Sequence, residues 1–234
     1  MAIINEIHGN IFATKCQVIV NTINCVGVMG AGIALECRYR HAEMFNRYKE
    51  YCDKGQMRPG VLFLWTQSEP WILNFPTKQS WKVDSTLAII QSGLEKFAQT
   101  YRDKGIHSIA FPRLGTSHGG LSWSDVRKLM YLYLEPLHDL EIEIYSFDGA
   151  AADSLFDRLR DLTVGRTPEN IARVFGIRSN QARSVAAALG DTRVGNMVAL
   201  QQYKGIGVKT AEKIYEVLCS NSVVMPHERQ MELF

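Results

Sequence analysis

Hydrophobic and polar positions follow two periods over the first 150 residues. Short apolar runs rich in β-branched residues alternate with longer stretches whose apolar residues recur at helical spacing. The runs predict strands, and the longer stretches predict helices. Strands that alternate with helices of about ten or more residues indicate an α/β domain with helices on both faces of its sheet. We predict strands at 2–7, 17–21, 61–65, 71–74, 108–111 and 141–147, and helices at 31–53, 84–104 and 124–134.

The pattern changes at residue 150, after which strand signals vanish and short glycine turns separate helical stretches. Such a change is typical of a domain boundary. The chain is therefore predicted to comprise an α/β domain at 1–149, a small all-α domain at 150–220 and a flexible tail at 221–234. The helices expected in the second domain are 151–162, 168–175, 179–189, 195–203 and 208–219.

Composition excludes several classes of protein. No apolar stretch approaches the roughly 20 residues that span a bilayer, so no membrane partner is expected. The five cysteines are scattered, odd in number and form no C-x-x-C pair. This pattern predicts no disulfide framework and no metal site, and it fits a cytoplasmic protein. No cofactor is expected.

Charge is distributed unevenly along the chain. Residues 1–149 hold 15 basic and 15 acidic residues, whereas 166–213 hold eight basic residues and three acidic ones. The excess of basic residues in the helical domain indicates a polyanionic partner. A solvated helical surface is the alternative.

The stretch 18–34 carries the first chemical signal. A buried strand, Val18 to Val20, ends at two asparagines, Asn21 and Asn24, and glycines then lead into a helix. Bare backbone at a helix N-terminus suits a phosphate, so we predict a pocket for a nucleotide diphosphate. The G-x-x-G-x-G spacing matches neither the dinucleotide fingerprint nor the Walker loop, and a flexible strand-to-helix turn remains the alternative.

Two further loops, 74–82 and 112–121, also follow strands. Ligands of α/β sheets bind at the carboxyl ends of strands, so one shared pocket is expected. Lys78 can serve there as a phosphate counter-charge, as a nucleophile that forms a Schiff base with an opened sugar C1, or as an ordinary surface lysine. The loop at 112–121 has glycines and hydroxyl groups that can bind a second phosphate. His118 in this loop either titrates near neutral pH or is an ordinary solvated residue.

Several of these segments resemble a macrodomain in the right order: Gly9-Asn10-Ile11, 20–24, 27–34, 74–78 and 115–123. The resemblance covers about residues 1–147 and is greatest to the branch that contains the DarG antitoxins, which are DNA ADP-ribosyl glycohydrolases. It implies a three-layer α/β/α fold with a mixed sheet, an ADP-ribose ligand, and hydrolysis of ADP-ribose from a modified base in DNA.

The resemblance also implies residue roles. Lys78 falls at the position of the catalytic lysine, Asn24 at the distal ribose, and Asn21 at the ribose end of the site. Two residues depart from the family pattern: Asn10 replaces an aspartate that accepts from the adenine amine, and Gly119 replaces an acidic residue of a related branch. The implied ADP-ribose site comprises Asn10, Ile11, Asn21, Asn24, Gly27, Val28, Met29, Gly30, Gly32, Ile33, Pro112, Gly115, Thr116, Ser117, His118, Gly119, Gly120 and Leu121.

The segment 200–214 has glycines at a predicted hairpin between two helices and resembles a helix-hairpin-helix motif. Exposed amides at such a turn bind a DNA phosphate without reading bases. An ordinary αα-hairpin is the alternative, and the earlier pair at 171–189 is either a second hairpin or a helix-turn-helix. The residues expected to contact the DNA backbone are Lys204, Gly205, Gly207, Lys209 and Thr210.

The last five residues, Gln230 to Phe234, resemble the Gln-x-x-Leu-Phe peptide that docks on the bacterial sliding clamp. Together these features predict a bacterial enzyme that removes ADP-ribose from DNA, as an antitoxin or a repair factor near the nucleoid. The alternatives are a protein ADP-ribosyl hydrolase localised to DNA and a non-catalytic ADP-ribose reader.

Overall fold

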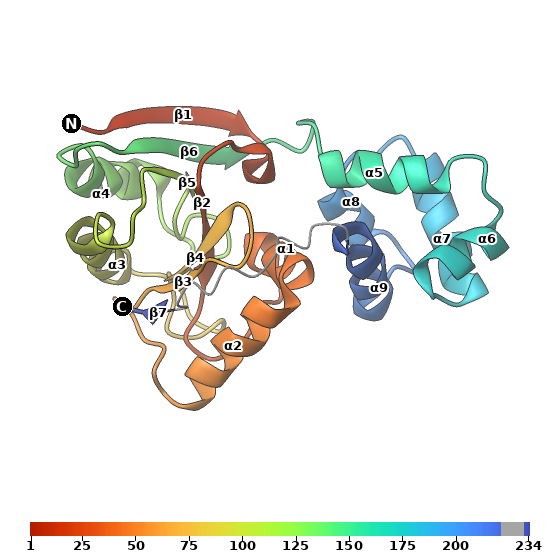
Figure 1. Cartoon of the computed structure of the whole chain (residues 1–234), viewed down its shortest axis with the longest axis horizontal. Helices are drawn as coiled ribbons and strands as arrows, with labels where there is room; N and C mark the ends of the chain where they lie inside the picture. Colours follow the sequence, from red (N-terminus) through yellow and green to blue (C-terminus); the bar gives the residue numbers. More distant parts are fainter. Residues whose placement is uncertain (221–231) are drawn as a thin grey trace. The chain divides into compact units, whose positions relative to one another are not determined.

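The computed structural model describes residues 1–220 and 232–234, and these divide into two units (Figure 1). The first unit comprises residues 1–147 and the C-terminal residues 232–234. The second begins at Asp148, two residues before the boundary expected from the sequence.

A mixed sheet runs through the first unit, in the order β1-β6-β5-β2-β4-β3-β7. The first five of these strands are parallel to one another, whereas β3 is antiparallel to both of its neighbours, β4 and β7. The apolar run of β2 suits its central place, because a strand between two parallel neighbours is buried on both faces. The strands are β1 (Ile3–Gly9), β2 (Val18–Ile23), β3 (Phe63–Trp65), β4 (Trp71–Pro76), β5 (Ser108–Pro112), β6 (Glu141–Phe147) and β7 (Glu232–Leu233).

Helices cover both faces of this sheet, which confirms the predicted three-layer α/β/α architecture (Figure 1). Side chains of β2 alternate between two cores: Val18 and Val20 pack with α3 and α4, whereas Ile19 and Ile23 pack with α1 and α2. This period-2 alternation follows from the pleat of a strand. The four helices are α1 (Gly32–Arg40), α2 (Ala42–Asp53), α3 (Leu87–Thr100) and α4 (Trp123–Leu134).

The prediction of a single helix at 31–53 is wrong. Two helices, α1 and α2, form instead, because the chain leaves the helical conformation at His41 (φ −135°, ψ 68°). Buried residues continue at helical spacing on both sides of the break, from Cys37 to Met44 and Tyr48, so the pattern carried no sign of it. The helix predicted from residue 84 begins instead at Leu87, because the Thr86 side chain caps it by accepting from the Ile89 amide (3.3 Å).

The C-terminal end of the chain forms β7 at the sheet edge, where a free tail was expected. Leu62 and Phe234 exchange two backbone hydrogen bonds of 2.6 and 2.9 Å. Leu233 packs against the α1/α2 core and Phe234 against the α3/α4 core, with the Lys104 ammonium 4.8 Å from the Phe234 ring centroid. The prediction of a flexible tail therefore needs correction at these residues, and 221–231 lie outside the described part.

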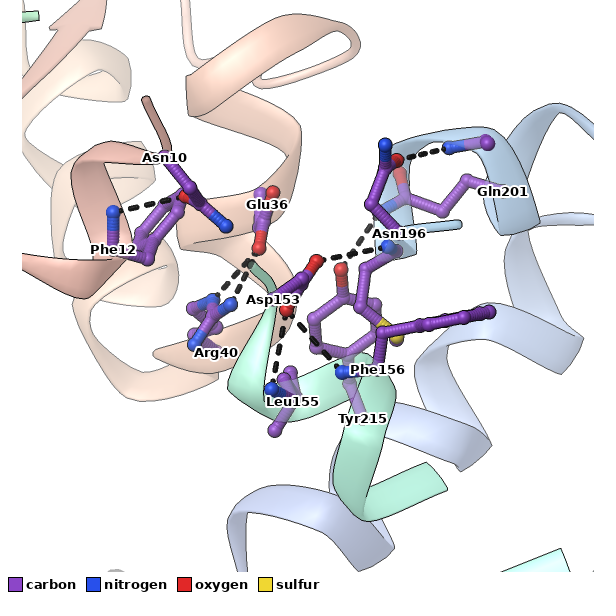
Figure 2. Close-up of polar contacts among 12 residues, drawn as sticks. Asn10, Phe12, Glu36, Arg40, Asp153, Leu155, Phe156, Asn196, Gln201 and Tyr215 are labelled. Carbon is purple, nitrogen blue, oxygen red and sulfur yellow. Dashed lines mark hydrogen bonds and ion pairs between the residues drawn. The ribbon is translucent and has the colours of Figure 1, made fainter. Parts of the chain in front are cut away.

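The second unit is all helical, as predicted. The buried Asp153 carboxylate caps α5 by accepting from the amides of Leu155 (3.1 Å) and Phe156 (3.2 Å), and it also accepts from Met197 at the start of α8 (2.9 Å; Figure 2). Within the described ranges, no helix has the length and apolarity needed to cross a membrane. The helices are α5 (Ser154–Thr163), α6 (Pro168–Phe175), α7 (Ser179–Gly190), α8 (Met197–Gln202) and α9 (Val208–Cys219).

Candidate functional site

Three loops meet at the carboxyl ends of β2, β4 and β5, where the sequence predicted a shared site. The loop after β4 joins the end of β2 through the Thr77 amide and the Ile23 carbonyl (2.9 Å). Further along, the Cys25 amide donates to the carbonyl of Gln79 (3.2 Å). The Ser85 amide donates to the carbonyl of Gly119 in the loop after β5 (3.0 Å). Backbone bonds thus hold the three loops together.

Lys78 links two of these loops. Its ammonium donates a hydrogen bond to the main-chain carbonyl of His118, and its own carbonyl accepts from the Cys25 thiol (3.4 Å). The side chain is only partly exposed. The lysine chosen from the sequence therefore lies between the loop after β2 and the loop after β5.

Asn24 organises the first loop from within. Its amide oxygen accepts from the Val26 amide (3.0 Å) and the Tyr48 hydroxyl (3.1 Å), and its amide nitrogen donates to the Val28 carbonyl (2.5 Å). Burial raises the pKa of the Tyr48 hydroxyl, so this group remains a donor. An asparagine suits this position because its amide group both accepts and donates hydrogen bonds within the loop. Contact between Asn24 and a ribose stays a prediction.

Asn21 lies deeper and pairs with a residue that the sequence analysis missed. The Asn21 amide nitrogen donates to the Asn74 amide oxygen (2.9 Å), and Asn74 donates to the Phe63 carbonyl (3.3 Å). Both asparagines are fully buried. They occupy paired positions of β2 and β4, so two asparagines in mostly apolar neighbouring strands were the available signal.

The Asn21 amide oxygen is buried and has no hydrogen-bond partner among the described residues. Buried polar groups are seldom left unpaired. The Asn21 amide nitrogen also donates to the Met29 sulfur of the first glycine loop (3.9 Å), and the amide oxygen is available to a water or ligand group.

Glycines give both phosphate-loop candidates their shape. Gly27 and Gly32 have φ of 77° and 55°, and Gly115 and Gly120 have φ of 67° and 74°, a region that side chains disfavour. The N-cap of α1, Ala31, makes no side-chain capping bond. The first amides of α1 consequently have no side-chain acceptor at the cap, as an anion site requires.

The two glycine loops face each other across a short distance. Built on Gly32, a Cβ atom would lie 3.6 Å from the His118 imidazole. Gly119 is more constrained, because a Cβ there would lie 2.2 Å from the Gly115 carbonyl oxygen and 2.4 Å from the Ser85 hydroxyl. The loop thus has no room for the acidic residue of the related branch.

Asn10 caps the short 3₁₀ helix η1 (Ile11–Ala13). Its amide oxygen accepts from the Phe12 amide (3.0 Å), and the Arg40 guanidinium lies 4.2 Å from the Phe12 ring centroid (Figure 2). Arg40 also forms an ion pair with the buried Glu36 (2.6 Å). The Asn10 oxygen retains a second lone pair, so the predicted bond to an adenine amine is compatible with this cap.

The remaining predicted ligand positions differ in exposure. Ile11 and Met29 are buried, and Thr116 donates its hydroxyl to the Arg113 carbonyl (3.0 Å). These residues are positioned to shape the loops. Val28, Gly30 and Ser117 are exposed, whereas Ile33, Pro112 and Leu121 are partly exposed.

Cysteine is a poor nucleophile at this site. Burial raises the pKa of the Cys25 thiol to about 12, so the group stays protonated and donates to the Lys78 carbonyl. The residues in the described ranges include no cluster of three or more His, Cys, Asp and Glu side chains placed to hold a metal ion.

The second unit contains the predicted hairpin between α8 and α9. Gly205 has φ of 93°, Ile206 is buried beneath the turn, and Lys204 and Lys209 are exposed. The prediction for Thr210 needs correction.

Thr210 is 1% exposed, and its hydroxyl accepts from the Gln181 side chain (2.7 Å). This bond connects α9 to α7, and the threonine side chain lies inside the helical unit, where it is not exposed to a ligand. The earlier helix pair, α6 and α7, turns at Gly176 (φ 60°).

Comparisons with known proteins agree with this geometry. Residues 20–130 match the family model of the Macro domain. The macrodomain of Mycobacterium tuberculosis DarG superposes with a TM-score of 0.60 at 38% identity, over 62% of this chain and 98% of that one. The chain belongs to the macrodomain family.

Longer relatives share the macrodomain portion. The DNA ADP-ribosyl glycohydrolase of Mycobacterium tuberculosis is 37% identical over 147 residues, which are 61% of this chain and 42% of the relative. That of Thermus aquaticus is 33% identical over 143 residues, 59% of this chain and 40% of the relative. The chain thus spans about two fifths of the length of these curated relatives.

One similar structure contains the ligand expected here. Thermosipho africanus DarTG in complex with ADP-ribose has a TM-score of 0.57 and 32% identity, over 62% of this chain and 42% of that one.

Proposed function

We propose that the macrodomain removes ADP-ribose from a modified base in DNA. The observation that carries this proposal is the position of Lys78, whose ammonium bridges to the His118 carbonyl between two glycine loops. Relatives named DNA ADP-ribosyl glycohydrolase, at 33–37% identity, support the same activity.

In this proposal the two glycine loops bind the diphosphate. The amides at the start of α1 and the backbone of 115–120 supply donors, and the positive end of the α1 dipole favours the negative charge. Asn24 and Asn21 hold the first loop in shape, so the ribose that carries the base is directed towards Lys78.

We assign Lys78 the role of nucleophile. The Lys78 ammonium first releases a proton to solvent, and the ribose ring opens as its ring oxygen takes up a proton. The free amine then attacks C1, the bond from C1 to the base nitrogen breaks, and the base leaves with the proton that the attacking nitrogen gives up. Water then hydrolyses the imine, which releases ADP-ribose and restores the amine. The His118 carbonyl orients the lysine before attack.

The test is release of ADP-ribose from an ADP-ribosylated oligonucleotide by the full chain. Lys78→Ala is expected to lower the rate at least a hundredfold, and borohydride is expected to trap a covalent adduct on wild type only. Lys128→Ala, an exposed lysine on α4, is the matched control. Equal rates for wild type and Lys78→Ala would contradict the lysine mechanism.

The same assay separates the alternatives. A reader binds ADP-ribose tightly in calorimetry but releases no product. A hydrolase of protein linkages acts on an ADP-ribosylated peptide in preference to the oligonucleotide when both are supplied together.

We further propose that the α8–α9 hairpin is a helix-hairpin-helix that holds the DNA backbone. Its support is the exposed Lys204 and Lys209 beside a glycine turn, in a segment with excess basic charge. Lys209→Ala should weaken DNA binding and reduce the slope of log K against log salt by about one. Lys213→Ala, whose ammonium already pairs with Glu216 (2.8 Å), is the control. An unchanged slope for Lys209→Ala would refute this role.

The last proposal concerns a sliding clamp as partner of Gln230–Phe234. Leu233 and Phe234 are engaged in β7, so clamp binding would require this strand to detach. Replacing both residues by alanine should abolish co-elution with a purified clamp, and persistent co-elution would exclude the peptide. A nucleoid-associated cytoplasmic protein with an antitoxin or repair role is consistent with these partners.

A further inference from the structure

An exposed tryptophan lies on the segment that follows Lys78. The indole of Trp81 is 56% exposed, and the nearby Val83 side chain is 49% exposed. Large aromatic side chains contribute much apolar area, and burying them is favourable. Trp81 belongs to neither core cluster of the macrodomain. Packing within the macrodomain therefore gives no reason for a tryptophan at this position.

This segment is fixed to both glycine loops. At its start the Gln79 carbonyl accepts from Cys25 (3.2 Å), and at its end the Ser85 amide donates to Gly119 (3.0 Å). Between these ends the Val83 amide donates to the Ser80 carbonyl and closes a turn (3.3 Å). Trp81 is therefore held beside the predicted ADP-ribose site.

The separation along the chain limits how far Trp81 can be from the chemistry. It follows Lys78 by three residues, so their Cα atoms are at most roughly 10 Å apart. Stacked nucleotides of one strand rise about 3.4 Å each. The separation between the two Cα atoms thus corresponds to at most about three stacked nucleotides.

The Lys82 cation beside the indole suits a nucleic acid. The Lys82 ammonium lies 5.4 Å from the centroid of the Trp81 ring, and both side chains are exposed. An aromatic face beside a cation is the combination that binds single strands, because bases stack on the ring and phosphates pair with the cation.

We propose that Trp81 is a stacking residue for a nucleobase next to the modified one, in single-stranded DNA, and that Lys82 pairs with the adjoining phosphate. The inference rests on the proposed function and names its substrate more closely. The macrodomain would then recognise the DNA strand as well as the ADP-ribose. It would favour a modified base within an oligonucleotide over an isolated modified nucleoside.

The experiment compares two substrates of the full chain: an ADP-ribosylated single-stranded oligonucleotide and a single ADP-ribosylated nucleoside. Trp81→Ala is expected to raise KM for the oligonucleotide about tenfold with kcat unchanged, a size typical of the loss of one stacked base. Its KM for the nucleoside should not change. Trp81→Phe should restore most of the loss, and Leu132→Ala, which removes a 67% exposed leucine of α4, should have no effect.

Binding supplies a second measurement that does not require turnover. Fluorescence anisotropy with the modified oligonucleotide in the Lys78→Ala background should show a similar loss of affinity when Trp81 is also replaced. If wild type releases no ADP-ribose but Trp81→Ala still weakens this binding, the proposed function fails and the stacking role stands. Unchanged oligonucleotide binding and KM, or equal losses on both substrates, would overturn the inference.

Discussion

The carbonyl oxygen of Gly115 lies 2.2 Å from the position that a Cβ atom would take on Gly119. The Gly115 carbonyl also accepts from the Leu121 amide (3.1 Å), and the Gly119 carbonyl accepts from Ser85. The second glycine loop is therefore closed upon itself, and its backbone leaves no space for a side chain at residue 119.

We expect Gly119→Ala to open this loop and to weaken ADP-ribose binding about tenfold or more, because the amides that bind the diphosphate lose their arrangement. Titration calorimetry measures the effect. Gly190→Ala in the helical unit is the control, since a Cβ there would meet nothing within 4 Å. Wild-type affinity in Gly119→Ala would show that the loop does not hold the ligand.

The Cys25 thiol should resist alkylation. Burial raises its pKa to about 12, so at pH 8 only about one part in ten thousand is the reactive thiolate. Iodoacetamide at pH 8 is therefore expected to leave Cys25 unmodified and activity intact, while the partly exposed Cys52 and Cys219 react first. Peptide mapping by mass spectrometry checks this order, with the urea-unfolded protein as control. Rapid loss of activity upon Cys25 labelling would be the contrary result.

Removal of Leu233 and Phe234 should destabilise the macrodomain. The deletion removes the two backbone bonds between Leu62 and Phe234 together with apolar contacts on both faces of the sheet. We expect a loss of about 2 kcal/mol in the free energy of unfolding, measured by urea denaturation. Phe147→Ala, which removes a 61% exposed ring, should change it by less than about 0.5 kcal/mol. Identical stability after the deletion would mean that β7 contributes nothing in solution.

Asp153→Ala should destabilise the helical unit by about 3 kcal/mol, because three amides at the starts of α5 and α8 lose a buried acceptor. Hydrogen exchange of these helices localises the effect. Asp157→Ala, an exposed acidic residue in the first turn of α5, is the control, with an expected change of about 0.5 kcal/mol. Equal protection of α5 and α8 in both variants would argue against the bridging role of Asp153.

The order of strands and helices could be read from the sequence because periodicity is a local property. Val18 to Val20 indicated a buried strand, and the change at residue 150 marked the helical unit. The same reasoning could not detect the break at His41, since helical spacing of apolar residues continues through it.

The site was predictable in part. The three loops and Lys78 follow strands whose carboxyl ends meet at one edge, so their convergence was expected and is observed. Asn74 was missed because its partner, Asn21, is 53 residues away along the chain. Thr210 was misplaced because its bonding partner, Gln181, lies 29 residues earlier in the chain, on α7 and outside the motif that suggested the role.

The sequence alone determined the α/β and all-α units and the glycine loops, because spacing and residue type depend only on chain order, and the resemblance to macrodomains selected Lys78. Only the tertiary structure decided which groups meet: Lys78 with the His118 carbonyl, Asn21 with Asn74, and Phe234 with the sheet edge. Such contacts join segments distant in sequence. Tertiary packing determines these contacts, and the local propensity of a segment does not predict them.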